Sequence, residues 1–297
     1  MDIDKRIILL GSGIEIDYLL RTLCNEVSVV AYGAEDRDSE QARQTVAFCK
    51  ENEIDLINNH KEVDAYNPDF IFMISYSKLI SIDYIEKFNF INLHAALLPE
   101  YRGIHGGTWA IINGEKNHGF TIHKVDEGID SGPIYYQLKI ESGDDDTVNT
   151  IRQRIFNEFK KVCRDVYIKL VKEEIEPIKQ DELQAKYVCK RTEKDSLIDW
   201  AAESEQVFNL IRALTPPYTL GAYTYYKGSK LYVLSSIKVN TPPYIGICGQ
   251  VVAKKKNEGV FVKCGDNTLL IKDISIDGRV LNSYDFFRTV GARLGVD

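Results

Sequence analysis

The chain has 297 residues, of which 44% are hydrophobic and 27% charged, and its formal net charge is -7 at pH 7. This length exceeds one average domain, so we expect two. No apolar run approaches the roughly 20 residues of a membrane helix, and the start MDIDKRIILLGSG lacks a signal-peptide pattern. The negative charge removes the general attraction to nucleic acid. We therefore expect a cytoplasmic protein whose partners are neither a membrane nor a nucleic acid.

Short apolar runs alternate with helical patterns in the first half of the chain. Strands are predicted at 6–11, 27–32, 54–57, 69–75 and 90–94, and helices at 16–23, 38–52 and 82–88. Strands this apolar are buried on both faces, which is typical of a parallel sheet covered by helices on both sides. Because crossovers are right-handed, this α/β half is predicted to be Rossmann-like.

The middle of the chain changes pattern twice. A short helix is predicted at 109–113, followed by strands at 119–126 and 132–141. From Val148 to Leu170, apolar residues recur every three or four positions. This spacing predicts a long amphipathic helix that is capped by Asp146 or Thr147 and ends before Pro177.

The last third of the chain contains short alternating strands. They follow a short helix at about 200–214 and are predicted at 222–226, 230–239, 249–255, 259–265 and 268–276. Gly, Asn and Asp turns between them indicate a small antiparallel β-barrel, OB-like in type. We predict an N-terminal domain at 1–180, a linker at 181–204 and a barrel domain at 205–297. Exposed strand edges favour pairing of two copies, so a homodimer fits this pattern.

Asn92 and His94 end the fifth predicted strand, at alternate positions, so their side chains point to the same side. Ligands bind at this edge of a Rossmann sheet. If Asp130 of the loop DEGIDSG folds back towards His94, its carboxylate orients and charges the imidazole beside the Asn92 amide. Such a set suits a reaction in which an oxyanion develops and a proton leaves. Neither motif holds a Ser or Cys nucleophile, which favours direct transfer between bound reactants.

Each of these features also has an alternative without catalysis. His94 is then a satisfied core histidine, and the turn of Gly11, Ser12 and Gly13 is a tight strand-to-helix connection instead of a phosphate cradle. That turn is not G-x-G-x-x-G, which disfavours a dinucleotide. The role of His105 stays open. The remaining histidines show no partner pattern: His60, His118 and His123.

The sequence also disfavours a metal. The six cysteines are scattered, without a C-x-x-C pair, which favours free thiols in a reducing compartment over disulfides or zinc. The residue pattern of the loop at 126–132 resembles that of a calcium-binding loop. It lacks the closing glutamate at the right spacing and does not sit between two helices, so we expect no metal.

Three stretches together resemble one family: NLHAALLPEYRG at 92–103, WAIINGE at 109–115 and GFTIHKVDEGIDSG at 119–132. They are similar to the folate-dependent formyltransferases, which use 10-formyltetrahydrofolate. The resemblance implies that residues 1–180 are the catalytic domain and that Asn92, His94 and Asp130 are the catalytic residues. It also implies that the folate's pterin end inserts near the loop after the fourth strand and against the 126–132 loop. The folate-contacting residues would be Tyr76, Leu79, Ile80, Val125 and Gly128.

The resemblance extends to the acceptor. The run IDWAAESEQVFNLIRALTPPYTLGAY at 198–223 resembles the start of the barrel shared by the methionyl-tRNA and nucleotide-sugar branches. We favour the sugar branch, because a tRNA-binding protein should show a basic face. The expected acceptor is the amine of a nucleotide-linked dideoxyhexose used for surface polysaccharides such as lipopolysaccharide. Methionyl-tRNA formyltransferase is the alternative.

The resemblance also suggests contacts for the nucleotide sugar. The glycinamide branch holds a substrate phosphate on a turn that Gly11, Ser12 and Gly13 match. Lys78, Arg102 and Tyr218 are further candidates, Arg102 for a phosphate and Tyr218 for stacking on a base. Their alternatives are an arginine that bonds loop carbonyls and a tyrosine that packs at a domain junction.

Two other functions would be compatible with this N-terminal half. A hydrolase that releases formate from the same folate carries a small domain in front, for which a first strand at residue 6 leaves no room. A binding protein without catalysis is disfavoured by the intact set of Asn92, His94 and Asp130.

Overall fold

The computed structural model describes residues 3–34, 38–242 and 244–295. The chain divides into two compact units. The first comprises the described residues within Met1–Gly106, Gly119–Ile140 and Arg154–Val188, and the second those within Gly107–His118, Glu141–Gln153 and Cys189–Asp297. The sequence-based boundaries at 180 and 205 remain a prediction. Among the described residues, no helix combines the length and the apolar character that a membrane span needs.

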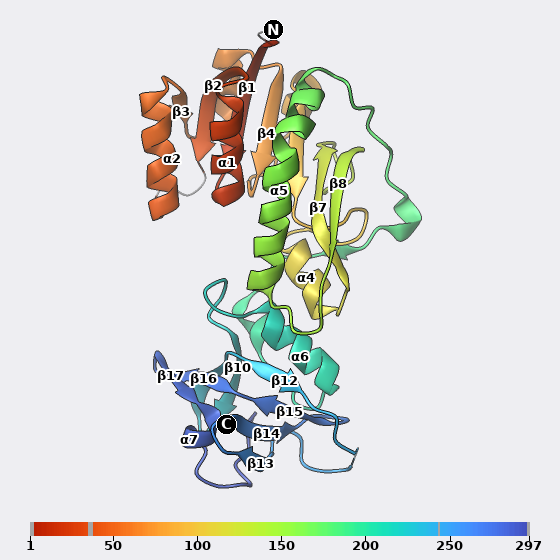
Figure 1. The fold of residues 1–297 in the computed structure, drawn as a ribbon. Helices are drawn as coiled ribbons and strands as arrows, with labels where there is room; N and C mark the ends of the chain where they lie inside the picture. The colour runs from red at the N-terminus through yellow and green to blue at the C-terminus, as the bar shows by residue number, and fades with distance from the viewer. Residues whose placement is uncertain (1–2, 35–37, 243, 296–297) are drawn as a thin grey trace. The chain divides into compact units, whose positions relative to one another are not determined.

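Seven strands form the sheet of the first unit, in the order β3-β2-β1-β4-β5-β7-β8 (Figure 1). They are β1 (Ile3–Gly11), β2 (Val27–Ala34), β3 (Asp55–Ile57), β4 (Phe70–Ile74), β5 (Phe90–His94), β7 (Asn117–Lys124) and β8 (Ile134–Glu141). Strands β1 to β5 pair in parallel, and β7 runs antiparallel to β5. The strand order reverses between β1 and β4. Ligands bind at such a switch point, beyond the carboxyl ends of the strands.

Helices cover both faces of this sheet. The unit contains α1 (Ile14–Leu23), α2 (Glu40–Glu51), the 3-10 helix η1 (His60–Tyr66), α3 (Ile82–Lys87) and α5 (Val148–Val171) from Arg154 onward. In β1, Ile7 points into a buried cluster with α1 and α5, whereas Ile8 points into a second cluster with Val63 of η1. This alternation follows from the period of two in a strand. The α/β, Rossmann-like prediction is confirmed.

The second unit contains two four-stranded antiparallel sheets. One contains β10 (Ala222–Tyr226), β11 (Ser229–Val233), β16 (Asp273–Ile276) and β17 (Arg279–Asn282). The other contains β12 (Ser236–Lys238), β15 (Thr268–Ile271), β14 (Gly259–Lys263) and β13 (Val251–Lys255). Its helices include α4 (Gly106–Ile112) from Gly107 onward, α6 (Ser204–Ala213) and α7 (Ser283–Phe286). Antiparallel β-structure in the C-terminal part is therefore confirmed.

Two predicted strands are each divided between these sheets. The run at 230–239 splits into β11 and β12, and the run at 268–276 splits into β15 and β16. At the breaks, Leu234 N donates to Asp273 O and Lys272 N donates to Ser235 O, so the two corners bond to each other. Apolar positions on either side of each corner keep the same alternation, and for this reason the sequence predicts single strands. Strand β17 carries mostly exposed side chains and gives no such signal.

The segment 181–204, predicted as a linker, has local structure. It contains η2 (Glu182–Gln184), β9 (Tyr187–Val188) and η3 (Glu193–Ser196). Elements this short leave no periodicity in a polar sequence. Strand β9 pairs in parallel with β6 (Arg102–Gly103), which brings Tyr187 opposite Arg102. The pairing holds this segment against the chain that follows β5.

Candidate active site

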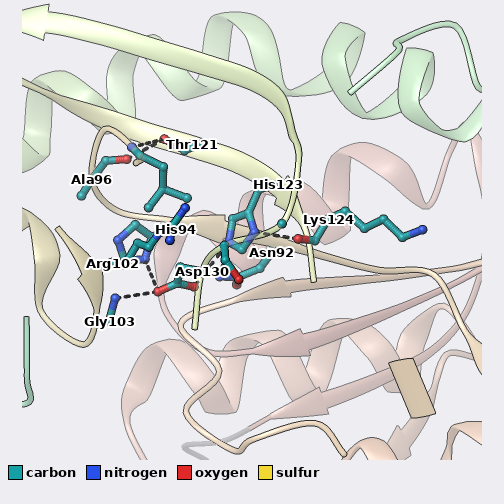
Figure 2. A network of polar contacts seen from close by, with 12 residues as sticks. Asn92, His94, Ala96, Arg102, Gly103, Thr121, His123, Lys124 and Asp130 are labelled. Atoms are coloured by element: carbon teal, nitrogen blue, oxygen red, sulfur yellow. Dashed lines mark hydrogen bonds and ion pairs between the residues drawn. The ribbon is translucent and has the colours of Figure 1, made fainter. Parts of the chain in front are cut away.

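Strand β5 carries the first two candidate residues to the carboxyl edge of the sheet. In its antiparallel pairing with β7, Asn92 lies opposite His123 and His94 lies opposite Thr121. Directly opposed residues share a face of the sheet. The four polar side chains therefore lie on one side, and Asp130 from the loop after β7 lies beside two of them, His94 and His123 (Figure 2).

The carboxylate of Asp130 lies beside His94. Its Oδ2 atom is 3.3 Å from Nδ1 of His94. The same oxygen accepts a 2.8 Å hydrogen bond from the Gly103 main-chain N–H. Asp130 has a φ of 50°, in the left-handed region. The fold-back of the 126–132 loop onto His94 therefore exists, and the structure brings Asn92, His94 and Asp130 together.

Both ring nitrogens of His94 face oxygen acceptors. Nε2 lies 2.8 Å from the carbonyl oxygen of Tyr101, on the side opposite Asp130. Only the imidazolium has a proton on each nitrogen for the two acceptors. Burial is the largest influence and holds the pKa of His94 below its ordinary value, although the Asp130 carboxylate and the Tyr101 carbonyl act in the opposite direction. Asp130 thus offsets part of the cost of burying a charged imidazole.

Asp130 itself remains ionised at neutral pH. Burial raises its pKa, but the hydrogen bond from His123, the charges of His94 and His123, and the Gly103 N–H together lower the pKa to about 2. The site therefore holds a carboxylate next to imidazole groups, with an amide beside them. This arrangement can stabilise an oxyanion and take up a proton.

His123 belongs to the same network, which corrects the expectation that it lacks partners. Its Nε2 atom lies 3.3 Å from Nδ2 of Asn92 and 3.4 Å from Oδ1 of Asp130. Its Nδ1 atom is 2.8 Å from the carbonyl oxygen of Lys124 and donates to it. The signal is present in the sequence: T-x-H in the strand at 119–126 alternates as N-x-H does in β5. Reading it requires the register between the two strands.

Three of the five predicted folate contacts pack on one apolar cluster. Tyr76, Ile80 and Val125 all lie against the buried group that contains Phe90 of β5. The Tyr76 hydroxyl also contacts His60, 2.9 Å from its Nδ1 atom, so His60 has a partner as well. The other two predicted contacts differ: Leu79 is 86% exposed, and Gly128 lies in the exposed part of the 126–132 loop.

The Gly11–Gly13 turn has a structural requirement of its own. A Cβ atom on Gly11, whose φ is 134°, would lie 1.8 Å from the carbonyl oxygen of Ile74. Ser12 N donates to that same oxygen at 3.2 Å. The close approach of β1 to β4 accounts for Gly11 without a ligand. Gly13 is exposed at the N-terminus of α1, where main-chain N–H groups are available.

The remaining substrate candidates have other contacts. Arg102 is fully buried. Its guanidinium has structural partners, but these are the side chains of Gln180, Glu182 and Tyr187 instead of the expected loop carbonyls. Exposed Lys78 places Nζ 3.4 Å from the Asn58 carbonyl oxygen. In the second unit, the Tyr218 hydroxyl lies 3.1 Å from Thr108 Oγ1, and its ring faces Arg152 at 4.6 Å. His105 is exposed, with a φ of 70°.

Comparison with known proteins identifies both parts of the chain. Residues 30–166 match the formyl transferase family model, and residues 190–291 match the model of the formyl transferase C-terminal domain. The methionyl-tRNA formyltransferase of Clostridium novyi is 33% identical over 240 residues, which cover 80% of this chain and 74% of that protein.

Solved structures share the fold at low sequence identity. An N-formyltransferase from Helicobacter canadensis, solved with folinic acid and dTDP-3-aminofucose, gives a TM-score of 0.68 at 19% identity and covers 89% of this chain and 97% of that one. HypX from Aquifex aeolicus gives a TM-score of 0.61 at 16% identity, covering 97% of this chain and 49% of that one. The two family matches and the C. novyi relative show that this chain belongs to the formyl transferase family and is a formyl-transferring enzyme.

Proposed function

We propose that the enzyme moves a formyl group from 10-formyltetrahydrofolate to the amine of a nucleotide-linked amino sugar of the dideoxyhexose type. The observation that carries the proposal is the 3.3 Å approach of Asp130 Oδ2 to His94 Nδ1, two residues along β5 from Asn92. The similarly folded H. canadensis enzyme, solved with folinic acid and dTDP-3-aminofucose, supports the choice of donor and acceptor.

Formyl transfer builds negative charge on one oxygen. The acceptor amine attacks the formyl carbon, and the carbonyl oxygen becomes an oxyanion in a tetrahedral intermediate. The amide of Asn92 and the positive charge of His94 stabilise that oxygen, and groups fixed in advance do so better than mobile water. Asp130 favours the protonated form of His94 and aligns its ring, while the Tyr101 carbonyl accepts its other N–H at 2.8 Å.

The intermediate then collapses towards products. The bond between the formyl carbon and N10 of the folate breaks, the amine nitrogen loses one proton, and N10 gains one. The products are an N-formylated sugar and tetrahydrofolate, so atoms and charge balance. The His94 imidazolium gives a proton to N10 as this bond breaks, and the neutral imidazole beside Asp130 then takes the proton that leaves the amine, directly or through a water.

We assign the donor to the apolar surface beside this pair. Tyr76, Ile80 and Val125 form one side of it through their common packing, and Leu79 and Gly128 lie on exposed loops that extend it. For the nucleotide sugar, Gly13 and Ser12 offer the N-terminus of α1 to a phosphate. Arg102 is left out of the phosphate site, because its guanidinium is buried and bonded within the protein.

Methionyl-tRNA formyltransferase is the second candidate. The 33% identity to the C. novyi enzyme over 240 residues favours it. The net charge of -7 opposes it, because binding to a phosphate backbone depends on basic residues.

One experiment separates the two candidates. The full chain is incubated with 10-formyltetrahydrofolate and either a panel of dTDP-, UDP- and CMP-linked amino sugars or charged initiator tRNA. A mass gain of one formyl unit on a sugar supports the proposal. Formylation of the tRNA alone assigns the chain to the second candidate, and no product with either set overturns both.

A further inference from the structure

Gln180 connects Asp130 to a buried arginine. Its Nε2 atom donates to the main-chain carbonyl oxygens of Asp130, at 2.8 Å, and Gly132, at 2.7 Å. Its Oε1 atom accepts from Nε and Nη2 of Arg102 at 3.1 and 2.9 Å. A guanidinium only donates and a carbonyl only accepts, so these partners fix the orientation of the amide. With 6% of its surface exposed, Gln180 uses both ends of its amide inside the protein.

Arg102 is held from its other side as well. Its Nη1 and Nη2 atoms bond to the two carboxylate oxygens of Glu182 at 2.9 and 2.7 Å, and Nη1 bonds to the Tyr187 hydroxyl at 2.7 Å. Its main-chain N–H donates to the Lys186 carbonyl at 2.8 Å. A bidentate arginine–carboxylate pair has a defined geometry. Arg102 is therefore a fixed point from which Gln180 reaches the 126–132 loop.

The two connections converge on one residue. Gln180 binds the main chain of Asp130, and Gly103, the neighbour of Arg102, donates its N–H to the Asp130 carboxylate at 2.8 Å. Main chain and side chain of Asp130 are thus tied to the same short stretch. Asp130 has a φ of 50°, which a non-glycine residue holds only where its surroundings impose it. Gln180 supplies part of that constraint.

We propose that Gln180 is a positioning residue for formyl transfer, acting through Asp130 to keep its carboxylate in line with His94. The inference rests on the proposed function for its effect on turnover, and on the contacts above for its geometry. Without the amide N–H groups, the carbonyl oxygens of Asp130 and Gly132 lose their donor. The left-handed conformation then loses support, and the carboxylate moves relative to the imidazole.

Gln180→Met tests this, because it keeps the length of the side chain and removes both hydrogen-bonding groups. We expect kcat to fall on the order of 10²-fold, the cost of a misplacement of about 1 Å. The KM for 10-formyltetrahydrofolate should change less than about threefold, since Gln180 lies outside the proposed folate surface. Gln184→Met is the matched control: Gln184 is exposed in the same segment and bonds only to Asp181 among the described contacts.

A double-mutant comparison tests whether Gln180 acts through Asp130. If it does, Gln180→Met combined with Asp130→Asn is no slower than Asp130→Asn alone, within about twofold, because residues that act as a unit are not additive. If the losses multiply, or if Gln180→Met alone keeps kcat within about twofold of wild type, the proposal is overturned.

A histidine NMR titration of the unliganded protein provides a readout that needs no turnover, with His94 assigned by a His94→Asn variant. Asp130 raises the pKa of His94, so its displacement in Gln180→Met should lower the pKa of His94, and an unchanged titration counts against the proposal. The titration still tests the positioning role of Gln180 if the wild-type chain formylates no acceptor and the proposed function has failed.

Gln180→Glu is the second variant, because it keeps acceptors for Arg102 and loses the donors to the loop. If Gln180→Met does not fold, Gln180→Glu is tested by the same kinetic measurements and the same titration. If both variants unfold while Gln184→Met folds, Gln180 serves stability alone and the proposal is overturned.

Discussion

The main chain of Gly106 packs directly against the imidazole of His94. A Cβ atom at position 106 would lie 2.9 Å from Nε2 of His94 and 2.4 Å from the carbonyl oxygen of Tyr101. These two atoms are joined by the 2.8 Å hydrogen bond that orients the ring. Any side chain at this position therefore competes with the contact that aligns His94 with Asp130.

We predict that Gly106→Ala lowers kcat on the order of 10²-fold and destabilises the fold by about 1–3 kcal/mol, the usual cost of overpacking. Steady-state kinetics and urea unfolding measure the two effects. Gly143→Ala is the control, because its Cβ would meet only Asp146, at an ordinary 3.5 Å. Wild-type turnover in Gly106→Ala would mean that His94 can shift without consequence for the reaction.

We expect substitutions of Asn92 and His94 to reduce turnover while the protein still folds. Removal of one preorganised donor to a developing oxyanion costs about 10²–10³ in rate, so Asn92→Ala and His94→Ala should each lose at least that much. The seven-stranded sheet remains, because β5 is held by its pairing with β4 and β7. Circular dichroism checks the fold and single-turnover kinetics check the chemistry. Near-normal turnover in either variant contradicts its assignment to the oxyanion.

Much of the first unit is predictable because its strands are continuous apolar runs between helices. The same reasoning reaches Asn92 and His94, since both lie on one strand and alternation alone puts them on one side. It fails for His123, whose importance depends on the register of β7 against β5. The register between these two strands cannot be deduced from a single sequence.

Gln180 shows a second kind of limit. Its surroundings in the sequence are polar and aperiodic, and its partners Asp130 and Arg102 come from distant parts of the chain. Only tertiary structure brings them together. The corners at Ser235 and Lys272 are a third case, because an apolar alternation that runs through a bend cannot reveal the bend.

The ionisation of Asp130 predicts how stability depends on pH. Its pKa is lowered from 3.8 to about 2 in the folded protein. A carboxyl group with a lowered folded pKa stabilises the protein above its unfolded pKa, and this stabilisation disappears as the pH falls through the folded value. A shift of this size corresponds to about 2 kcal/mol.

We therefore expect the free energy of unfolding of wild type, relative to Asp130→Asn, to fall by about that amount between roughly pH 5 and pH 2. Urea unfolding of both proteins at several pH values measures the difference. Above roughly pH 5 the contribution of the Asp130 ionisation itself should be constant. A difference that stays constant through the acid range as well would show that the Asp130 carboxylate has no favourable partner in the fold.

Leu79 provides a test of the folate surface that leaves the catalytic groups untouched. Its side chain is 86% exposed, so Leu79→Ser should change the free energy of unfolding by no more than about 0.5 kcal/mol. Covering a leucine with a ligand is worth about 1.5–3 kcal/mol, so the KM for 10-formyltetrahydrofolate should rise about tenfold or more, with kcat little changed. Leu220→Ser, at a residue 74% exposed in the second unit, is the matched control. If calorimetric titration with folinic acid gives the same Kd for Leu79→Ser and wild type, Leu79 does not contact the folate, and the donor binds elsewhere on the sheet edge.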